Sequence, residues 1–386
     1  MIKFMAGIFL AILFTQRRNQ KMNVLITTSP YTTLLYFLVN DLQDIKSSAC
    51  FFIRNRHYSS EERKKITSIM PKSYFLIESP LRIRFRGNAL TRRLYTALQL
   101  VLRRGIPYVF LRVSKKFRWS FLNTAEIFAY DNSPTAAALI GRRDYTFLEE
   151  GLFTYQNADR FANNNSLDLR LQDFCAKPFG IRGLAANSQA KRIILTGLAE
   201  IPECYSKKNL DVVSMLELWK ESGRDKQEFI MKFFELEASD VEAVKSKDII
   251  LVDQPLADDG LMTKAEQIEL VRRILDHYGA SNVLLKTHYR NSINYRAVFP
   301  DVMVWDKFTP MELLTFCGVK FREAVTVNST AVLTLPSDVK IEWLGIDTAN
   351  SFFDHLSEPS STILRNFINS IPTPNRIQTQ ERSTKL

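Results

Sequence analysis

A chain of 386 residues is long enough for two domains of ordinary size. Its 46% hydrophobic and 24% charged residues are typical of a folded globular protein and exclude a largely disordered one. The net charge is +11, but residues 54–118, with 17 Lys/Arg and 3 Glu, carry a balance of +14, so the rest of the chain is slightly acidic. A basic block confined to one region indicates a surface that faces an anionic partner, either nucleic acid or an acidic membrane leaflet. An ordinary solvated basic face is the alternative.

The N-terminal segment, residues 1–21, contains an apolar run of 11 residues (4–14) followed by Arg17, Arg18 and Lys21. That run is shorter than the roughly 20 residues that span a bilayer, and it lacks the cleavage site of a secretory signal. We expect either an extension upstream of a true start at Met22 or a weak membrane-surface segment, and no transmembrane helix.

From Met22 onward, short apolar strands alternate with helices, which predicts parallel sheets covered on both faces. We expect a first α/β domain over residues 22–190, in which 156–190 form the interdomain connection. Its expected strands are 23–28, 49–54, 73–78, 107–112, 125–130 and 145–151. Its expected helices are 31–42, 59–70 (with a Ser cap and early Glu residues), 88–105 and 133–141.

A second α/β domain is expected over residues 191–350, facing the first across a ligand-binding cleft, because ligands bind beyond the carboxyl ends of parallel strands. Its expected strands are 192–197, 248–256, 281–290, 302–305 and 339–345, with a strand, turn and helix over 323–335. Its expected helical regions are 211–245, 263–279 and 309–318. Residues 351–371 are expected to form a helix that crosses back to the first domain, and 372–386 a disordered tail.

Two adjacent carboxylates end the last strand of the first domain, in the sequence Glu149-Glu150-Gly151. Successive strand residues point to opposite faces, so one acid can face the cleft while the other makes a structural hydrogen bond. A carboxylate in an apolar cleft has a raised pKa, which suits a general base, and Gly151 allows a sharp turn. An ordinary acidic turn is the alternative.

The second domain carries two further polar clusters of three residues each. They are Lys286, His288 and Arg290 after one strand, and Asn328, Ser329 and Thr330 between a strand and a helix. Small hydroxyl residues at a helix start cap the helix and, with its free N–H groups and dipole, bind phosphate. A histidine between two cations at a neighbouring strand end would add to such a phosphate site. A purely structural cap and a satisfied core histidine are the alternatives.

Several common motifs are missing from the sequence. It contains no GxGxxG, GxxxxGK[ST], HExxH or GxSxG, so Rossmann oxidoreductases, P-loop enzymes, zincins and α/β-hydrolases are not supported. The acidic pair in residues 257–260, "ADDG", is interpreted as a turn. The four cysteines are scattered without CxxC spacing, which argues against a zinc site or a disulfide framework and is typical of a reducing compartment.

The order "EEG", "ILVDQPL", "KTHYR", "NST" on two α/β domains resembles family 52 of the glycosyltransferases, the bacterial lipooligosaccharide sialyltransferases and relatives with the GT-B fold. The resemblance covers residues 22–371. It implies that Glu150 is the general base for the acceptor hydroxyl and that His288 contacts the donor phosphate and assists its departure. It also implies a supporting role for Glu149 and Gly151. The donor phosphate and nucleotide would be bound by Lys286, Arg290, Asn328, Ser329 and Thr330.

The resemblance further implies an inverting transfer without a metal ion or other cofactor. CMP-sialic acid is the first expected donor, with transfer to a terminal galactose of a lipooligosaccharide or related glycan. The sequence departs from the family pattern in Glu150, where Asp is typical, and in Thr287 and Tyr289, where prolines flank the histidine. Transfer of glucose or another sugar from a UDP-sugar is therefore the alternative, and a non-catalytic basic protein that binds membrane or nucleic acid is the alternative of another class.

The expected partners follow from the same resemblance. They are a nucleotide sugar, a glycolipid or oligosaccharide acceptor, and an anionic membrane surface met by residues 54–118, with no nucleic acid. The expected place is the cytoplasm, peripheral to the cytoplasmic face of the inner membrane. Family members can form homodimers, and no residue of this sequence identifies such an interface.

Overall fold

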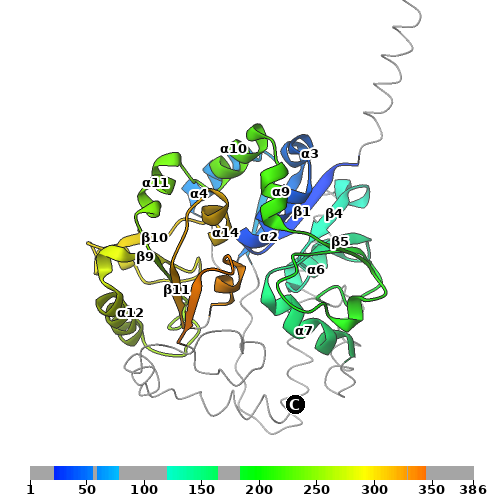
Figure 1. The fold of residues 1–386 in the computed structure, drawn as a ribbon. Helices are drawn as coiled ribbons and strands as arrows, with labels where there is room; N and C mark the ends of the chain where they lie inside the picture. The colour runs from blue at the N-terminus through cyan, green and yellow to red at the C-terminus, as the bar shows by residue number, and fades with distance from the viewer. Residues whose placement is uncertain (1–20, 55–58, 78–119, 164–182, 328, 345–386) are drawn as a thin grey trace, which may run out of the picture. The chain divides into compact units, whose positions relative to one another are not determined.

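The structure is a computed structural model that describes residues 21–54, 59–77, 120–163, 183–327 and 329–344 (Figure 1). The chain divides into two compact units, the first ending at Ile230 and the second beginning at Met231. Each unit is an α/β structure built on its own parallel sheet, so the expected fold class is confirmed. The cleft expected between the two sheets stays a prediction.

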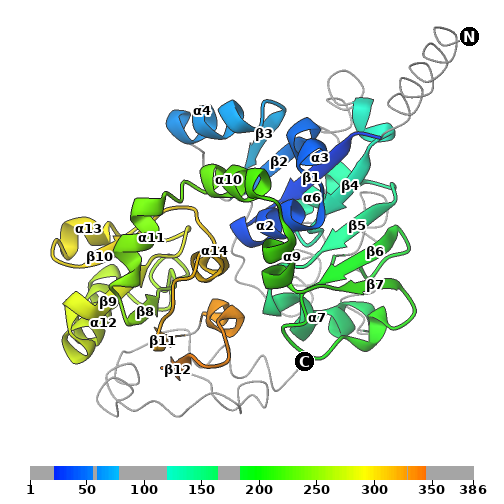
Figure 2. The ribbon, with the colours of Figure 1, turned by 45° about the horizontal axis from the view of Figure 1, so that its top comes forward.

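The sheet of the first unit has seven strands within the described residues, in the order β3-β2-β1-β4-β5-β6-β7, and all pairs are parallel (Figure 2). The strands are β1 (Asn23–Thr27), β2 (Ala49–Arg54), β3 (Ser73–Ile77), β4 (Glu126–Ala129), β5 (Tyr145–Leu148), β6 (Ala190–Leu195) and β7 (Asn209–Val212). β1 and β5 are buried along their whole length, as expected for strands covered on both faces.

The expected domain boundary at residues 190/191 is wrong. β6, which we expected to open the second domain, pairs with β5 of the first sheet, and β7 continues that sheet. Local patterns could not show this, because a strand that extends one sheet and a strand that starts another have the same apolar signature. The boundary lies 40 residues later, within α10 (Arg224–Phe233).

Several helices of the first unit begin at the capping residues that the sequence indicates. Ser59 starts α4 with a complete capping box, since its side chain and that of Glu62 each bond the other's backbone N–H. Ser29 caps α2 and Ser133 caps α6 without a capping box, because each hydroxyl accepts one backbone N–H of the first turn. The helices of the unit are α2 (Pro30–Val39), α3 (Leu42–Ser47), α4 (Ser60–Ile69), α6 (Pro134–Ile140), α7 (Leu152–Asn163), α9 (Met215–Glu221) and α10, with 3₁₀ turns η1 (Ser120–Asn123) and η3 (Glu203–Tyr205).

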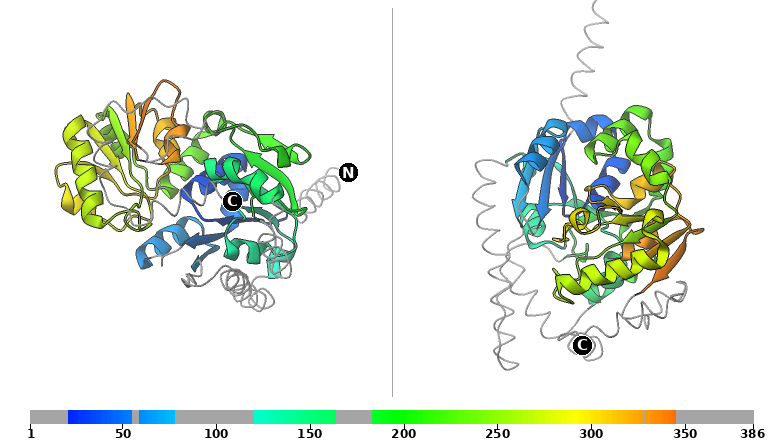
Figure 3. Two further views of the ribbon diagram at one scale, coloured as in Figure 1. Left: turned by 90° about the horizontal axis from the view of Figure 1, so that it is seen from below. Right: turned by 90° about the vertical axis from the view of Figure 1, so that its left-hand side faces the viewer.

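The sheet of the second unit has five strands within the described residues, in the order β10-β9-β8-β11-β12, and all pairs are parallel. The strands are β8 (Ile249–Val252), β9 (Val283–Lys286), β10 (Met303–Trp305), β11 (Glu323–Thr326) and β12 (Lys340–Trp343). Helices lie on both faces of this sheet (Figure 3). They are α11 (Ala238–Lys245), α12 (Lys264–Tyr278), α13 (Tyr295–Val298) and α14 (Met311–Phe316), with 3₁₀ turns η4 (Ala280–Asn282) and η5 (Thr330–Thr334).

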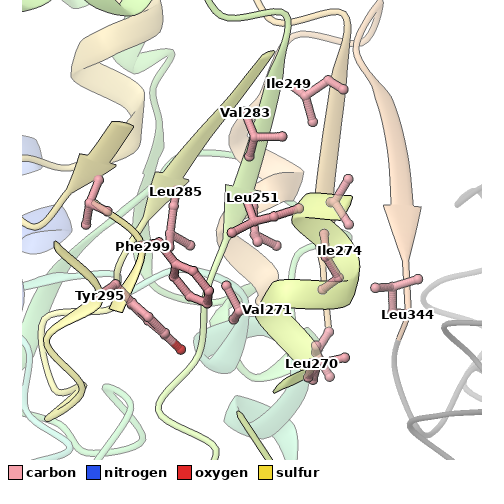
Figure 4. Packing of buried hydrophobic residues seen from close by; sticks show 14 of the residues in the cluster. Ile249, Leu251, Leu270, Val271, Ile274, Val283, Leu285, Tyr295, Phe299 and Leu344 are labelled. Carbon is pink, nitrogen blue, oxygen red and sulfur yellow. The ribbon is translucent and has the colours of Figure 1, made fainter. Parts of the chain in front are cut away.

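The helix α12 forms one wall of the core of the second unit. It starts with a capping box at Thr263 and ends at Gly279, whose φ of 79° favours glycine. Its Val271 and Ile274 pack with Leu251 and Leu285 of the sheet (Figure 4). Each such buried aliphatic side chain contributes about 1.5–3 kcal/mol to folding, so this packing fixes the strands whose ends carry the polar clusters.

Some expectations concern segments outside the described residues. These segments are the N-terminal residues 1–20, the helix 88–105, the strand 107–112, the C-terminal helix 351–371, the tail 372–386 and most of the basic block 54–118. Within the ranges that the structure does describe, no helix is long and apolar enough to cross a membrane.

Candidate active site

In the first unit, two adjacent acids follow β5 at the carboxyl edge of the sheet, where ligand sites of open parallel sheets lie. The structure separates them as the alternation of a strand predicts. Glu149 is fully buried, and Glu150 is partly exposed. The two carboxylates therefore lie in different environments, one buried and one partly exposed, although they are neighbours in the chain.

The carboxylate of Glu149 joins three elements around the end of β5. It accepts hydrogen bonds from the hydroxyls of Tyr31 in α2 at 2.7 Å and Tyr155 in α7 at 2.6 Å. Thr196, directly after β6, donates to it from its backbone N–H at 2.7 Å and from its hydroxyl at 2.5 Å. Burial raises the pKa of Glu149, and these donors oppose the shift. Glu149 thus ties together the elements that surround Glu150.

Glu150 is partly exposed and is oriented by hydrogen bonds to its neighbours. Its Oε1 accepts from the Thr28 hydroxyl at 2.8 Å, just beyond β1, and its backbone N–H donates to Thr154 at 3.3 Å. Gly151 follows with a φ of 72°, which a larger residue adopts only with strain, and this turn carries the chain directly into α7. A partly exposed carboxylate with a fixed orientation can take a proton from a bound hydroxyl group.

In the second unit, β9 ends at Lys286, which lies in register with Val252 of β8 and Trp305 of β10. Its ammonium donates to the carbonyl of Thr287 at 3.2 Å. Burial lowers the pKa of Lys286 to about 8, although Glu312 and Asp306 favour the charged form. Lys286 is therefore a cation at neutral pH, and its charge is lost in the mildly alkaline range.

His288 has a neutral imidazole ring. Burial, together with the charges of Arg290 and Lys286, lowers its pKa to about 3. Its Nδ1 accepts the backbone N–H of Arg290 at 3.1 Å, so the ring proton of the neutral imidazole is on Nε2. The ring also stacks on Tyr289, with centroids 4.5 Å apart. The imidazole can therefore donate from Nε2 to an oxygen anion without carrying a charge itself.

Arg290 differs from the expectation of a freely available phosphate ligand. Its guanidinium forms a forked ion pair with Asp259, with N···O distances of 2.8 and 3.3 Å. Asp259 belongs to the "ADDG" segment, which is a turn as expected. The turn also binds the histidine loop, which the sequence alone did not indicate. A phosphate beside Arg290 would meet a charge that is already partly balanced.

The hydroxyl cluster after β11 differs from the expected helix cap. Ser329 is buried, its backbone N–H donates to the Thr326 hydroxyl at 2.9 Å, and its side chain makes no capping bond. Where we expected a helix, the structure has the five-residue 3₁₀ turn η5. Pro336 follows this turn and disfavours helical geometry in the residue before it. So short a turn has little dipole. Asn328 lies outside the described residues.

The ends of β9 and β11 are on the same edge of the sheet but are not direct neighbours, contrary to our expectation. β8 lies between them, with Val252 in register with both Lys286 and Thr326. The residue that follows β8 is Asp253, a buried carboxylate that we did not select. A carboxylate directly after the wholly apolar strand "IILV" was the signal that could have found it.

A second buried carboxylate that sequence reasoning missed lies in the first unit. Asp131 follows β4 and accepts from the Tyr145 hydroxyl at 2.5 Å and from the backbone N–H groups of Leu184 and Ala185 at 2.6 and 3.0 Å. Leu184 and Ala185 have φ values of 54° and 51°. Burial raises the pKa of Asp131 to about 6. Because these partners are groups of the fold itself, we assign Asp131 a structural role.

The described residues contain no group of three or more His, Cys, Asp or Glu side chains that could hold a metal ion. Three cysteines, Cys50, Cys204 and Cys317, are free thiols. Transfer without a metal ion was expected from the resemblance and stays a prediction.

Each of the two α/β units carries polar side chains at the carboxyl ends of its parallel strands, where ligands of such sheets bind. Residues 140–350, more than half of the chain, match the model of glycosyltransferase family 52. The chain belongs to this family, which confirms the resemblance. The matched span contains Glu150, His288 and Ser329.

Comparison with individual proteins gives more distant similarities. A Haemophilus influenzae protein described as uncharacterized is 31% identical over 169 residues, which are 44% of this chain and 55% of that protein, so this chain spans about half of that relative. Among solved structures, a sialyltransferase from Photobacterium damsela superposes with a TM-score of 0.49 at 9% identity, covering 83% of this chain and 73% of that one. An α/β-galactoside α-2,3-sialyltransferase from Photobacterium phosphoreum gives 0.46 at 12% identity, covering 84% and 90%.

The lowered pKa of Lys286 gives a pH prediction for anion binding. A bound phosphate favours the charged ammonium, so above about pH 8 we expect binding of CMP or UDP to weaken and to take up a proton. Lys286→Arg should remove this dependence, because arginine stays charged. Calorimetry in two buffers of different ionisation enthalpy measures the proton uptake. The exposed Lys264→Arg is the control, and equal uptake in Lys286→Arg would exclude Lys286 as its source.

Proposed function

We propose that the protein is an inverting glycosyltransferase that needs no metal ion and transfers sialic acid from CMP-sialic acid to a galactose-terminated surface glycan. The observation that carries this proposal is the family match over residues 140–350, whose span includes the acids after β5 and the histidine after β9. The donor follows from the family resemblance. Transfer from a UDP-sugar is the alternative donor chemistry on the same framework.

In the proposed reaction, Glu150 removes the proton from the acceptor hydroxyl as that oxygen attacks the anomeric carbon of the donor. The bond from this carbon to the nucleotide phosphate breaks at the same time, and the phosphate leaves with the bonding electrons. Glu150 suits the role of general base because its carboxylate is oriented by the Thr28 hydroxyl and is partly exposed.

The departing phosphate would be stabilised by groups of the second unit. Lys286 supplies a positive charge at neutral pH, and His288 supplies a neutral N–H donor from Nε2. Fixed donors that meet charge as it develops lower the barrier without any reorganisation of the site. Ser329 and Thr330 are proposed to complete the phosphate site, while Arg290 chiefly orders the loop through Asp259.

The acceptor is proposed to be a glycolipid or oligosaccharide met at the cytoplasmic face of the inner membrane. The argument for this location is the charge of residues 54–118, since each Lys or Arg near an anionic leaflet contributes roughly 1 kcal/mol to binding. Such binding must weaken as salt rises, because exposed charges are screened.

A panel of nucleotide sugars tests the proposal. The purified protein is incubated with CMP-sialic acid, UDP-glucose and UDP-galactose, with and without a lactoside acceptor, and nucleotide release is measured. We expect acceptor-dependent release of CMP. Release of UDP alone would replace the donor and keep the enzyme class, whereas a folded protein that releases no nucleotide would overturn glycosyl transfer.

A further inference from the structure

The loop that carries His288 is held from one side by three aspartates of the segment that follows β8. Asp259 forms an ion pair with Arg290. The Asp258 carboxylate accepts two hydrogen bonds from Ser292, one from the backbone N–H at 2.8 Å and one from the hydroxyl at 2.7 Å. Both of these aspartates are exposed. Asp253 is the third, and it is buried.

Asp253 binds the loop through Asn291, whose side-chain amide donates to the Asp253 Oδ2. The backbone N–H of the same Asn291 donates to the carbonyl of His288 at 2.9 Å and closes the turn that contains the histidine. The amide oxygen of Asn291 accepts from the N–H of Ile293 at 2.9 Å, which fixes the orientation of the amide. One residue thus connects the buried carboxylate to the backbone of His288.

The other oxygen of Asp253 is bound by the body of the second unit. Its Oδ1 accepts from the Gln267 amide of α12 at 3.1 Å, and the Tyr295 hydroxyl of α13 lies 3.4 Å away. Gln267 also donates to the carbonyl of Gln254 at 2.7 Å and accepts from the N–H of Ala257 at 2.8 Å. Asp253 is therefore anchored to two core helices on one side and to the histidine loop on the other.

We propose that Asp253 is a positioning residue for His288: through Asn291 it holds the turn in which the Arg290 N–H meets Nδ1, so that the imidazole keeps its proton on Nε2. This inference rests on the proposed role of His288 at the donor phosphate. A buried carboxylate is costly unless its hydrogen bonds are made, and here Oδ2 accepts the side-chain amide of Asn291 in the histidine loop.

The test uses the full-length protein with ¹⁵N-labelled histidine, and His288→Gln identifies the signal among the 4 histidines. In the wild type we expect one tautomer with a protonated Nε2. In Asp253→Asn and in Asn291→Ala, we expect a mixture of tautomers and an imidazole pKa nearer the ordinary value of about 6.5. Nucleotide release should fall by about 10- to 100-fold, chiefly in kcat, because the Nε2–H group of His288 is misplaced rather than removed.

The double variant Asp253→Asn/Asn291→Ala should be no slower than the slower single variant, since both changes break one connection. Asp248→Asn, an exposed aspartate just before β8, is the matched control and should leave the tautomer unchanged. If Asp253→Asn does not fold, the partly exposed Asn291→Ala decides the question. An unchanged His288 tautomer in the folded variants overturns the proposal. A wild type that releases no nucleotide overturns the proposed function instead. The tautomer measurement then still decides whether Asp253 positions the His288 ring.

Discussion

Replacing Glu150 by Gln is expected to lower kcat for sugar transfer by about 10²- to 10⁴-fold, which is the usual loss when a general base is removed. Gln keeps the size of the side chain and can still accept from the Thr28 hydroxyl, so the fold and the KM for the nucleotide sugar should change little. Steady-state kinetics with the donor and acceptor identified by the panel measure both constants.

Two further substitutions make this result specific to Glu150. Glu221→Gln changes an exposed acid of α9 and should have wild-type kinetics. Glu149→Gln puts an amide donor among the hydroxyl and N–H donors of Tyr31, Tyr155 and Thr196, so it should lower the free energy of unfolding by about 1–3 kcal/mol. Denaturant unfolding separates that loss from a catalytic one. A kcat within threefold of wild type in Glu150→Gln would exclude Glu150 as the base.

Replacing His288 by Ala is expected to slow release of the nucleotide by about 10²- to 10³-fold, the typical loss when one fixed donor to a developing anion is deleted. His288→Gln should retain more activity than the alanine variant, because its amide can also donate a neutral N–H. Single-turnover measurements of nucleotide release compare the two variants with the wild type.

The lowered pKa of His288 adds a pH profile to this prediction. With a pKa of about 3, the ring stays neutral from pH 5 to 8, so His288 should contribute no acid limb to the wild-type rate in that range. A rate that falls as pH rises through about 6.5, in a limb that disappears in His288→Gln, would show instead that the imidazole titrates and acts as a proton donor.

Local features of the chain were predictable because their signals lie within a few residues. The capping boxes at Ser59 and Thr263 and the buried strand before Glu149 follow from short-range chemistry, and the structure confirms these elements. The different environments of Glu149 and Glu150 follow from the period of a strand in the same way.

Long-range features were not predictable, because they depend on which segments meet. The pairing of β6 with β5 needs the sheet itself, and the partner of Arg290 is 31 residues away in the chain. Asp253 was missed for the same reason, since its significance comes from Asn291, which is 38 residues further on. A one-dimensional pattern shows that a polar residue follows a strand and does not show what it binds.

The membership of β6 and β7 in the first sheet matters for anyone who separates the two units. A fragment ending at residue 190 would remove both strands and leave the backbone groups of β5 without a partner on one side. An uncovered, apolar strand edge of this kind recruits other chains and promotes aggregation. It would also remove Thr196, and with it two of the donors to Glu149. A fragment that is to fold alone and keep its acidic pair in place should therefore extend to about residue 230.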